Sequence, residues 1–230
     1  MKLALISIGI QNKSIENELR KLIGKDFKGL KILFCTTAAK YYSDEMNGWL
    51  IEDLEFFKKH DCEIDMCDIN EGSLAHLLPR FERADVFYFG GGNTQWLRKC
   101  IKNSGLETHL EKLLETKVWI GISAGSCVLT PTTTNPVLNL AGETIEGYPS
   151  DGLNLVDFQF IPHLNSPSYC VFNEQNIRRE SLKLTANDGK KLYALDDESA
   201  LFIENGSVKV VSEGNWFEVD ISCCETFYTT

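Results

Sequence analysis

The sequence predicts a doubly wound α/β fold built on a mostly parallel sheet. From the N-terminus to about residue 130, short apolar runs alternate with amphipathic helical segments. The runs are almost continuously apolar, which is typical of parallel strands covered on both faces. A loop rich in Thr, Asn and Pro follows, and short strands recur after it. Because no linker or repeat interrupts the 230 residues, we expect a single domain, 1–230, with a small antiparallel C-terminal β extension at about 191–221.

Strands and helices alternate in the first part of the chain. In the first helix, Ile15, Leu19 and Leu22 recur at helical spacing. The second helix ends in a basic turn, which its dipole favours. The third contains Pro79, where it must bend or stop. The predicted strands cover 3–10, 31–37, 62–69, 86–92 and 117–122, and the predicted helices cover 14–24, 46–60, 72–84, 93–105 and 106–117.

The second part of the chain reads as loop and short strands. Four apolar runs follow the Thr-rich loop, and Asn205-Gly206 between two of them is typical of a hairpin turn. The predicted strands here cover 155–162, 191–197, 199–207 and 208–221.

Composition and charge exclude several classes of protein. The formal net charge of −10 repels phosphate backbones, so we expect no nucleic-acid partner. No apolar run is long enough to span a bilayer, and the N-terminus lacks a cleavage site typical of a signal peptide. The eight cysteines are scattered and include no Cys-x-x-Cys pair, which favours reduced core thiols over disulfides or a zinc site. We therefore expect a cytoplasmic protein without a metal or cofactor, and a homodimer remains open.

The run Gly121-Ile122-Ser123-Ala124-Gly125 matches the G-x-S-x-G pattern. It follows a predicted buried strand and precedes an apolar segment that can begin a helix. In a nucleophile elbow, the flanking glycines permit a strained turn that exposes the serine hydroxyl above the sheet. The same run also fits a plain strand-to-helix turn, so the pattern alone leaves both interpretations open.

Gly90-Gly91-Gly92 likewise follows a predicted strand and precedes a helix. Consecutive glycines are costly in backbone entropy, so they indicate a sharp turn or close approach to a ligand. The spacing matches neither G-x-G-x-x-G nor a P-loop. Because both glycine-bearing loops emerge from the same sheet edge, we expect this one to offer an amide N–H opposite Ser123.

A serine nucleophile needs a base, and the chain has four histidines. His60, His76 and His109 lie in predicted helices, where a packing or surface role is the simplest one. His163 instead follows an apolar strand and precedes a loop, a position where catalytic groups converge. We therefore favour His163 as the base.

The motifs FGGGNTQWL, GISAGSCVL and PHLN in combination resemble the S51 serine peptidases, the group of peptidase E (aspartyl dipeptidase) and cyanophycinase. The resemblance covers roughly residues 1–205. It implies a fold related to class I glutamine amidotransferases, a catalytic pair of Ser123 and His163, and an oxyanion hole formed by the backbone N–H groups of Gly92 and Ala124. It also implies a serine exopeptidase that hydrolyses dipeptides or other short peptides.

The sequence departs from this family at the acid of the triad. The stretch Thr133-Thr134-Asn135-Pro136, where the family carries a carboxylate, has none. Glu143 is our first candidate because it lies near that segment. The other candidates are Glu146, Asp151, Asp157 and the amide of Asn139. Without an orienting group, turnover falls about 10⁴-fold, so a catalytically impaired protein that binds small peptides or metabolites is the alternative.

The residues that would select the substrate are less marked. Aspartyl dipeptidases of the family carry an arginine after the histidine, and that position aligns with Asn173 here. Arg178 lies further along the same predicted helix, and Asn93 follows the glycine run. We take Asn93, Asn173 and Arg178 as candidate substrate-binding residues, without a strict preference for aspartate. Glutamine amide hydrolysis is disfavoured because Cys127 lies four residues after the elbow serine.

Overall fold

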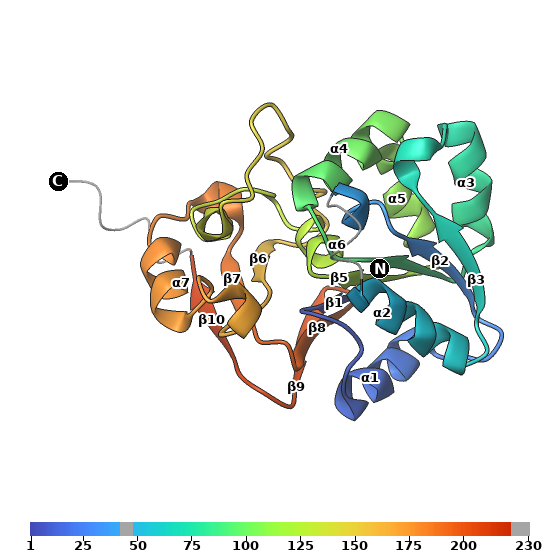
Figure 1. The fold of residues 1–230 in the computed structure, drawn as a ribbon, viewed down its shortest axis with the longest axis horizontal. Coiled ribbons are helices and arrows are strands. Elements are labelled where there is room, and N and C mark those ends of the chain that lie inside the picture. Colours follow the sequence, from blue (N-terminus) through green and yellow to red (C-terminus); the bar gives the residue numbers. More distant parts are fainter. Residues whose placement is uncertain (42–47, 222–230) are drawn as a thin grey trace.

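The computed structural model describes residues 1–41 and 48–221. Its main sheet has seven strands in the order β3-β2-β4-β5-β1-β8-β9 (Figure 1). The first five positions hold parallel strands, and β8 and β9 are antiparallel. This architecture confirms the predicted mostly parallel α/β fold. The strands of this sheet are β1 (Lys2–Ile6), β2 (Lys31–Cys35), β3 (Glu63–Cys67), β4 (Val86–Phe89), β5 (Val118–Ile122), β8 (Ser199–Glu204) and β9 (Ser207–Ser212).

Helices cover both faces of the main sheet. One core packs the inward side chains of α1 and α2 against residues such as Phe34, and the other packs α3, α4 and α5 against residues such as Leu33. Neighbouring residues of one strand therefore serve opposite cores, because side chains alternate across a sheet. The helices are α1 (Lys13–Ile23), α2 (Gly48–Lys59), α3 (Leu74–Arg83), α4 (Thr94–Ser104), α5 (Glu107–Leu113), α6 (Ala124–Cys127) and α7 (Glu174–Ser181).

A smaller sheet has the order β10-β7-β6 and lies with α7 at the other end of the molecule (Figure 1). It consists of β6 (Phe158–Ile161), β7 (Lys191–Leu195) and β10 (Trp216–Asp220). β7 is parallel to β6 and antiparallel to β10. A third core, which includes Ile161, Ile177 and Leu192, lies between this sheet and α7.

The strands of the predicted C-terminal extension do not form one antiparallel unit. β8 and β9 extend the main sheet, whereas β7 and β10 belong to the smaller one. The predicted strand 208–221 is divided between β9 and β10, which lie in different sheets. The hairpin turn at Asn205-Gly206 is confirmed, with positive φ of 52° and 81°, because such a turn matches the twist of the paired strands.

Pro79 lies within α3, which continues to Arg83.

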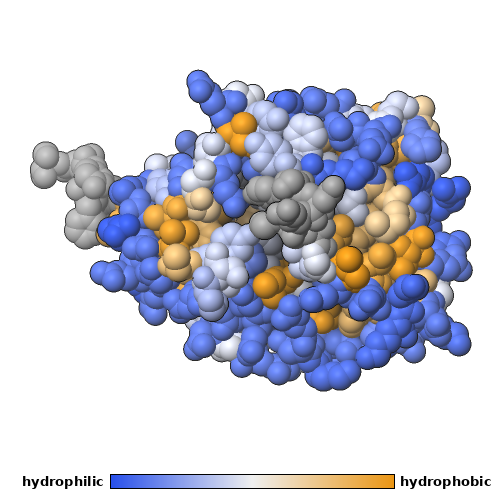
Figure 2. Space-filling view, in the orientation of Figure 1, coloured by the Kyte–Doolittle hydropathy of each residue, from blue (hydrophilic) through white to orange (hydrophobic). Residues whose placement is uncertain are grey.

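On the face seen in Figure 2, most of the periphery is hydrophilic and apolar side chains gather nearer the middle. No helix in the two described ranges has the length and apolar character needed to cross a membrane.

Three parallel neighbours, β4, β5 and β1, end at one edge of the main sheet. The turn at Gly90–Asn93 follows β4, Ser123 follows β5 and Ser7 follows β1. The smaller sheet supplies His163 just after β6, and the connection from β7 to β8 supplies Asp197. Five loops distant in sequence thus meet where the two sheets adjoin.

Replacing Phe34 by Ala tests the two-sided core. The ring is fully buried and stacks on Tyr88 with ring centroids 4.2 Å apart. Its removal leaves a cavity, so the free energy of unfolding should fall by about 3–5 kcal/mol. Leu182→Ala is the matched control, because Leu182 is 64% exposed and should change this free energy by less than about 0.5 kcal/mol. Denaturant unfolding measures both, and equal losses would contradict the described core.

Candidate active site

Ser123 lies on a sharp turn between β5 and α6. Its backbone has φ 47° and ψ −107°, a combination that a residue with a side chain rarely adopts. The Ser123 N–H donates to the Ile6 carbonyl at 2.9 Å, and the Ser126 hydroxyl donates to the Gly121 carbonyl at 2.7 Å. A Cβ on Gly125 would lie 2.0 Å from the Phe89 carbonyl, so only glycine fits there. This turn has the geometry of a nucleophile elbow and leaves Ser123 partly exposed.

His163 and Ser123 are hydrogen-bonded. The Nε2 atom of His163 lies 3.0 Å from Ser123 Oγ, and Nδ1 lies 2.8 Å from Asp197 Oδ1. Because an ionised carboxylate only accepts, Nδ1 carries a proton, and in the neutral ring Nε2 then accepts from the serine hydroxyl. The ring also stacks on Tyr169, with centroids 4.4 Å apart. The three side chains therefore form a continuous Ser-His-Asp chain.

The carboxylate beside His163 is Asp197, and the expectation of Glu143 in this position is corrected. Glu143 lies in a loop on the pocket rim. Among the other candidates, Asp151 pairs with Arg98, Asp157 pairs with Lys190, and Asn139 accepts a hydrogen bond from Thr144. Asn135, in the stretch where the family carries a carboxylate, accepts hydrogen bonds from the Val137 and Leu138 N–H groups of its own loop.

Asp197 follows His163 in the chain, so it lies outside the segment between the serine and the histidine in which the family resemblance places the acid. A signal was present in the sequence, since Asp196-Asp197 directly follows an apolar strand. That strand, β7, is parallel to β6, whose own end leads to His163. Carboxyl ends of adjacent parallel strands meet at one edge, so the pairing of these two strands brings His163 and Asp197 together.

The surroundings of Asp197 favour its charged form. Burial opposes ionisation, but hydrogen bonds from His163, Ser166 and Ser7 and the charge of His163 outweigh it, so the pKa of Asp197 lies below its ordinary value. Asp197 is thus ionised at neutral pH, as an acceptor for the Nδ1 proton must be.

Ser7 connects the backbone of His163 with the carboxylate of Asp197. Its hydroxyl donates to Asp197 Oδ1 at 3.1 Å and accepts from the His163 N–H at 2.8 Å. Ser7 is fully buried. His163 has a positive φ of 63°, an uncommon conformation for a side-chain-bearing residue. One buried hydroxyl therefore holds both partners of the Nδ1 hydrogen bond.

The glycine run after β4 lies beside the serine. A Cβ on Gly91 would lie 3.5 Å from Ser123 Cβ, and one on Gly92 would lie 2.2 Å from the Ala38 carbonyl. Gly92 also has a φ of 127°, so it must be glycine. Within the described ranges, the Gly92 and Ala124 N–H groups donate to no backbone carbonyl.

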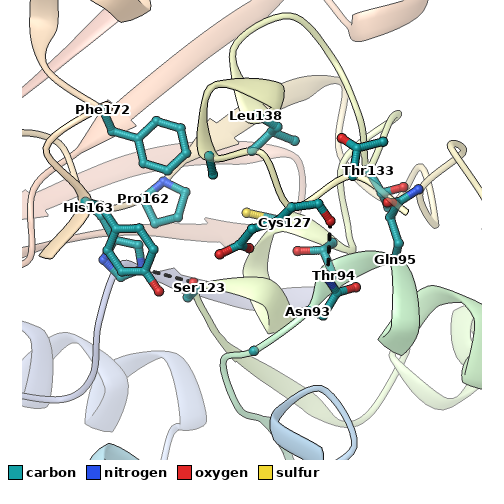
Figure 3. Close-up of a pocket in the computed structure, with 15 residues that line it drawn as sticks. Asn93, Thr94, Gln95, Ser123, Cys127, Thr133, Leu138, Pro162, His163 and Phe172 are labelled. Carbon is teal, nitrogen blue, oxygen red and sulfur yellow. Dashed lines mark hydrogen bonds between the residues drawn. The ribbon is translucent and has the colours of Figure 1, made fainter. Parts of the chain in front are cut away.

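The pocket above Ser123 has one polar and one apolar side. It holds about 580 Å³ of empty space, part of it open to solvent. Figure 3 shows Ser123 and His163 at one end, with Pro162 and Phe172 above them and Asn93, Gln95 and Thr133 at the other end. Across the part of the chain that the structure describes, no cluster of His, Cys, Asp and Glu side chains is arranged to hold a metal ion.

Of the three predicted substrate-binding residues, the structure brings Asn93 alone to the pocket wall. The Asn93 side chain caps α4 by accepting from the Trp96 N–H at 2.8 Å. Asn173 and Arg178 are not among the lining residues. Asn173 caps α7, and Arg178 pairs with Glu174 and lies over the ring of Phe217.

Cys127 lines the pocket but is not suited to act as a nucleophile. It is buried, and its Sγ lies 3.5 Å from the Phe160 carbonyl. Burial and then the charge of Glu143 raise the pKa of its thiol to about 12. A thiolate, the reactive form, is therefore scarce at neutral pH.

Comparisons with known proteins point to one family. The profile of Peptidase family S51 matches residues 3–211. An uncharacterized peptidase of Listeria monocytogenes is 27% identical over 63% of this chain and 69% of its own length. The peptidase E of a Nostoc species is 29% identical over 84% of this chain and 76% of its own length. The solved structure of a peptidase from an acI-B1 Actinobacterium superimposes with a TM-score of 0.70 at 19% identity, and covers 94% of this chain and 88% of its own.

Replacing Asp197 by Asn tests whether the negative charge of Asp197 stabilises the folded protein, because this contribution depends on pH. Because the folded pKa of Asp197 is lowered, the unfolded state binds more protons as pH falls below the ordinary value of about 3.9. The stability that the charge contributes is complete above that pH and is lost as pH falls through the folded pKa. The difference in unfolding free energy between wild type and Asp197→Asn should therefore narrow from pH 7 to about pH 3. A constant difference in denaturant unfolding would contradict the assignment.

Replacing Ser7 by Ala should affect stability and the titration of Asp197 together. It leaves the buried His163 N–H unpaired, which costs about 1–3 kcal/mol of unfolding free energy. It also removes a donor to the charged carboxylate, so the pKa of Asp197 should rise toward its ordinary value. Carbon NMR of the Asp197 carboxyl group measures this shift. An unchanged titration would show that Ser7 does not act on Asp197.

Proposed function

Because the chain belongs to peptidase family S51 and is a serine peptidase, we propose that it acts as an exopeptidase on dipeptides or other short peptides. The observation that carries the proposal is the hydrogen-bonded chain of Ser123, His163 and Asp197. Such a chain turns a weakly nucleophilic hydroxyl into an attacking group.

In the proposed mechanism, Ser123 Oγ attacks the carbonyl carbon of the scissile peptide bond. Its proton passes to His163 Nε2, and the negative charge of Asp197 stabilises the resulting imidazolium. The tetrahedral intermediate collapses as the C–N bond breaks, and the imidazolium protonates the departing amine. Water then attacks the acyl-serine ester with His163 as the base, which releases the acid and restores Ser123.

The developing oxyanion would accept hydrogen bonds from the N–H groups of Gly92 and Ala124. Ala124 directly follows Ser123, and Gly92 lines the same pocket as Ser123. Neither N–H group donates to a backbone carbonyl in the described ranges. Donors that are fixed before the reaction favour the intermediate over the planar carbonyl, and each is worth about 10²–10³ in turnover.

The wall of the pocket supports a short substrate. The loop that contains Leu138 and Glu143 forms part of its wall, so a long chain would meet this loop. The alternative of an impaired binding protein rests on a missing carboxylate, and Asp197 supplies one.

The proposal predicts that Ser123 is the single point of covalent reaction. A fluorophosphonate should label wild-type protein at Ser123, and a dipeptide library should be cleaved. Ser123→Ala should abolish both. Asp197→Asn should lower kcat by about 10⁴-fold, because the imidazole loses its orienting acceptor. Labelling is located by peptide mass spectrometry, and cleavage is followed by release of free amine.

Glu146→Gln serves as the control for these variants. Glu146 is exposed and is not among the residues that line the pocket, so its turnover should equal that of wild type. Labelling at another residue, or full turnover in Asp197→Asn, would reject the mechanism.

A further inference from the structure

The pocket carries a carboxylate on its rim but no basic side chain. Glu143 lines it together with Ser123, and none of the described lining residues is Lys or Arg. Glu143 is solvent-exposed, so a ligand can reach it. The bound group that this charge favours is therefore a cation, and an acidic substrate side chain would meet repulsion instead.

Hydrogen bonds to α4 hold the backbone around Glu143 in place. Asn93 Nδ2 donates to the Glu143 carbonyl at 3.4 Å, and the Ile145 N–H donates to Gln95 Oε1 at 2.7 Å. Gln95 Nε2 in turn donates to the Pro149 carbonyl at 3.0 Å. Asn93 directly follows the glycine run beside Ser123, and Gln95 lies two residues further on. The same segment that borders the nucleophile therefore fixes the position of the rim loop.

The charge of Glu143 also acts on residues inside the pocket. After burial, it is the next cause that raises the pKa of Cys127 to about 12 and the pKa of Tyr169 above its ordinary value. Cys127 follows the elbow, and Tyr169 stacks on the ring of His163. The negative potential of this carboxylate thus extends to the catalytic end of the pocket.

The remaining wall is apolar. Leu138, Ala141, Pro162 and Phe172 line it, and they suit an uncharged side chain. A small peptide with an ammonium group at the rim and an apolar side chain against this wall would match both features. A carboxylate accepts hydrogen bonds and does not donate them, so an ammonium group is its direct complement.

We propose that Glu143 binds the ammonium group of the substrate and so selects peptides that carry one close to the scissile bond. This inference rests on the proposed peptidase function. The ammonium group can be the N-terminal amine of the peptide or the side chain of a lysine, and the experiment below distinguishes the two. Glu143 is thereby assigned to substrate selection instead of orientation of His163.

Binding to the Ser123→Ala protein tests the inference without turnover. Titration calorimetry compares Ala-Leu with N-acetyl-Ala-Leu, which lacks the amine. We expect Ala-Leu to bind about 10- to 100-fold more tightly, as a charge-assisted hydrogen bond provides. Adding Glu143→Gln should reduce this ratio to near one, whereas adding Glu146→Gln should leave it unchanged. Because Glu143 is exposed, the ratio should also fall at high salt.

A third ligand identifies the source of the ammonium group. If N-acetyl-Lys-Leu binds more tightly than N-acetyl-Ala-Leu and Glu143→Gln abolishes that difference, the group is the lysine side chain. If Ala-Leu binds more tightly than N-acetyl-Ala-Leu but N-acetyl-Lys-Leu does not, the ammonium group is the N-terminal amine. Glu143→Lys is a second variant, which should reverse the preference in favour of N-acetyl-Ala-Leu.

Two results would overturn the inference. One is that Ala-Leu and N-acetyl-Ala-Leu bind to the Ser123→Ala protein with equal affinity, or that neither binds. The other is a preference that persists in Glu143→Gln and Glu143→Lys. Failure of the peptidase function is seen separately, as absent fluorophosphonate labelling of Ser123 in the wild-type protein.

Discussion

The position of one imidazole ring depends on contacts from both sheets. His163 follows β6 of the smaller sheet, its Nδ1 faces Asp197 on the connection to the main sheet, and its N–H donates to Ser7 at the end of β1. Tyr169 covers one face of the ring. These contacts leave Nε2 directed at Ser123. The site is therefore a property of the junction between the sheets and of no single element.

Close backbone packing supports the other half of the site. Ser123 keeps an unfavourable φ because the turn is tied to β1 and because Gly125 lies against the β4 backbone. Strain of this kind persists only where the surrounding structure fixes it. The buried strands β4, β5 and β1 hold the turn in this conformation. The strained turn leaves Ser123 partly exposed at the edge of the sheet.

The two carboxylates of the site, Asp197 and Glu143, lie in different electrostatic surroundings. Asp197 is partly buried and takes hydrogen bonds from His163, Ser166 and Ser7, which keeps it charged next to the ring. Glu143 is exposed on a loop and faces solvent and the pocket. Their different surroundings, and not their chemistry, distinguish the carboxylate that orients the base from the carboxylate that lines the pocket at its solvent-exposed side.

The sequence alone predicted the fold class, the tight turns at Ser123 and at the glycine run, and a histidine at a strand end, because each depends on local pattern. Apolar periodicity marks buried strands, and glycine spacing marks tight turns. It did not determine which carboxylate meets the ring or where Asn173 and Arg178 face. Those depend on the parallel pairing of β7 with β6 and on the direction of α7. Such contacts join residues far apart in the chain, and only tertiary packing brings them within hydrogen-bond distance.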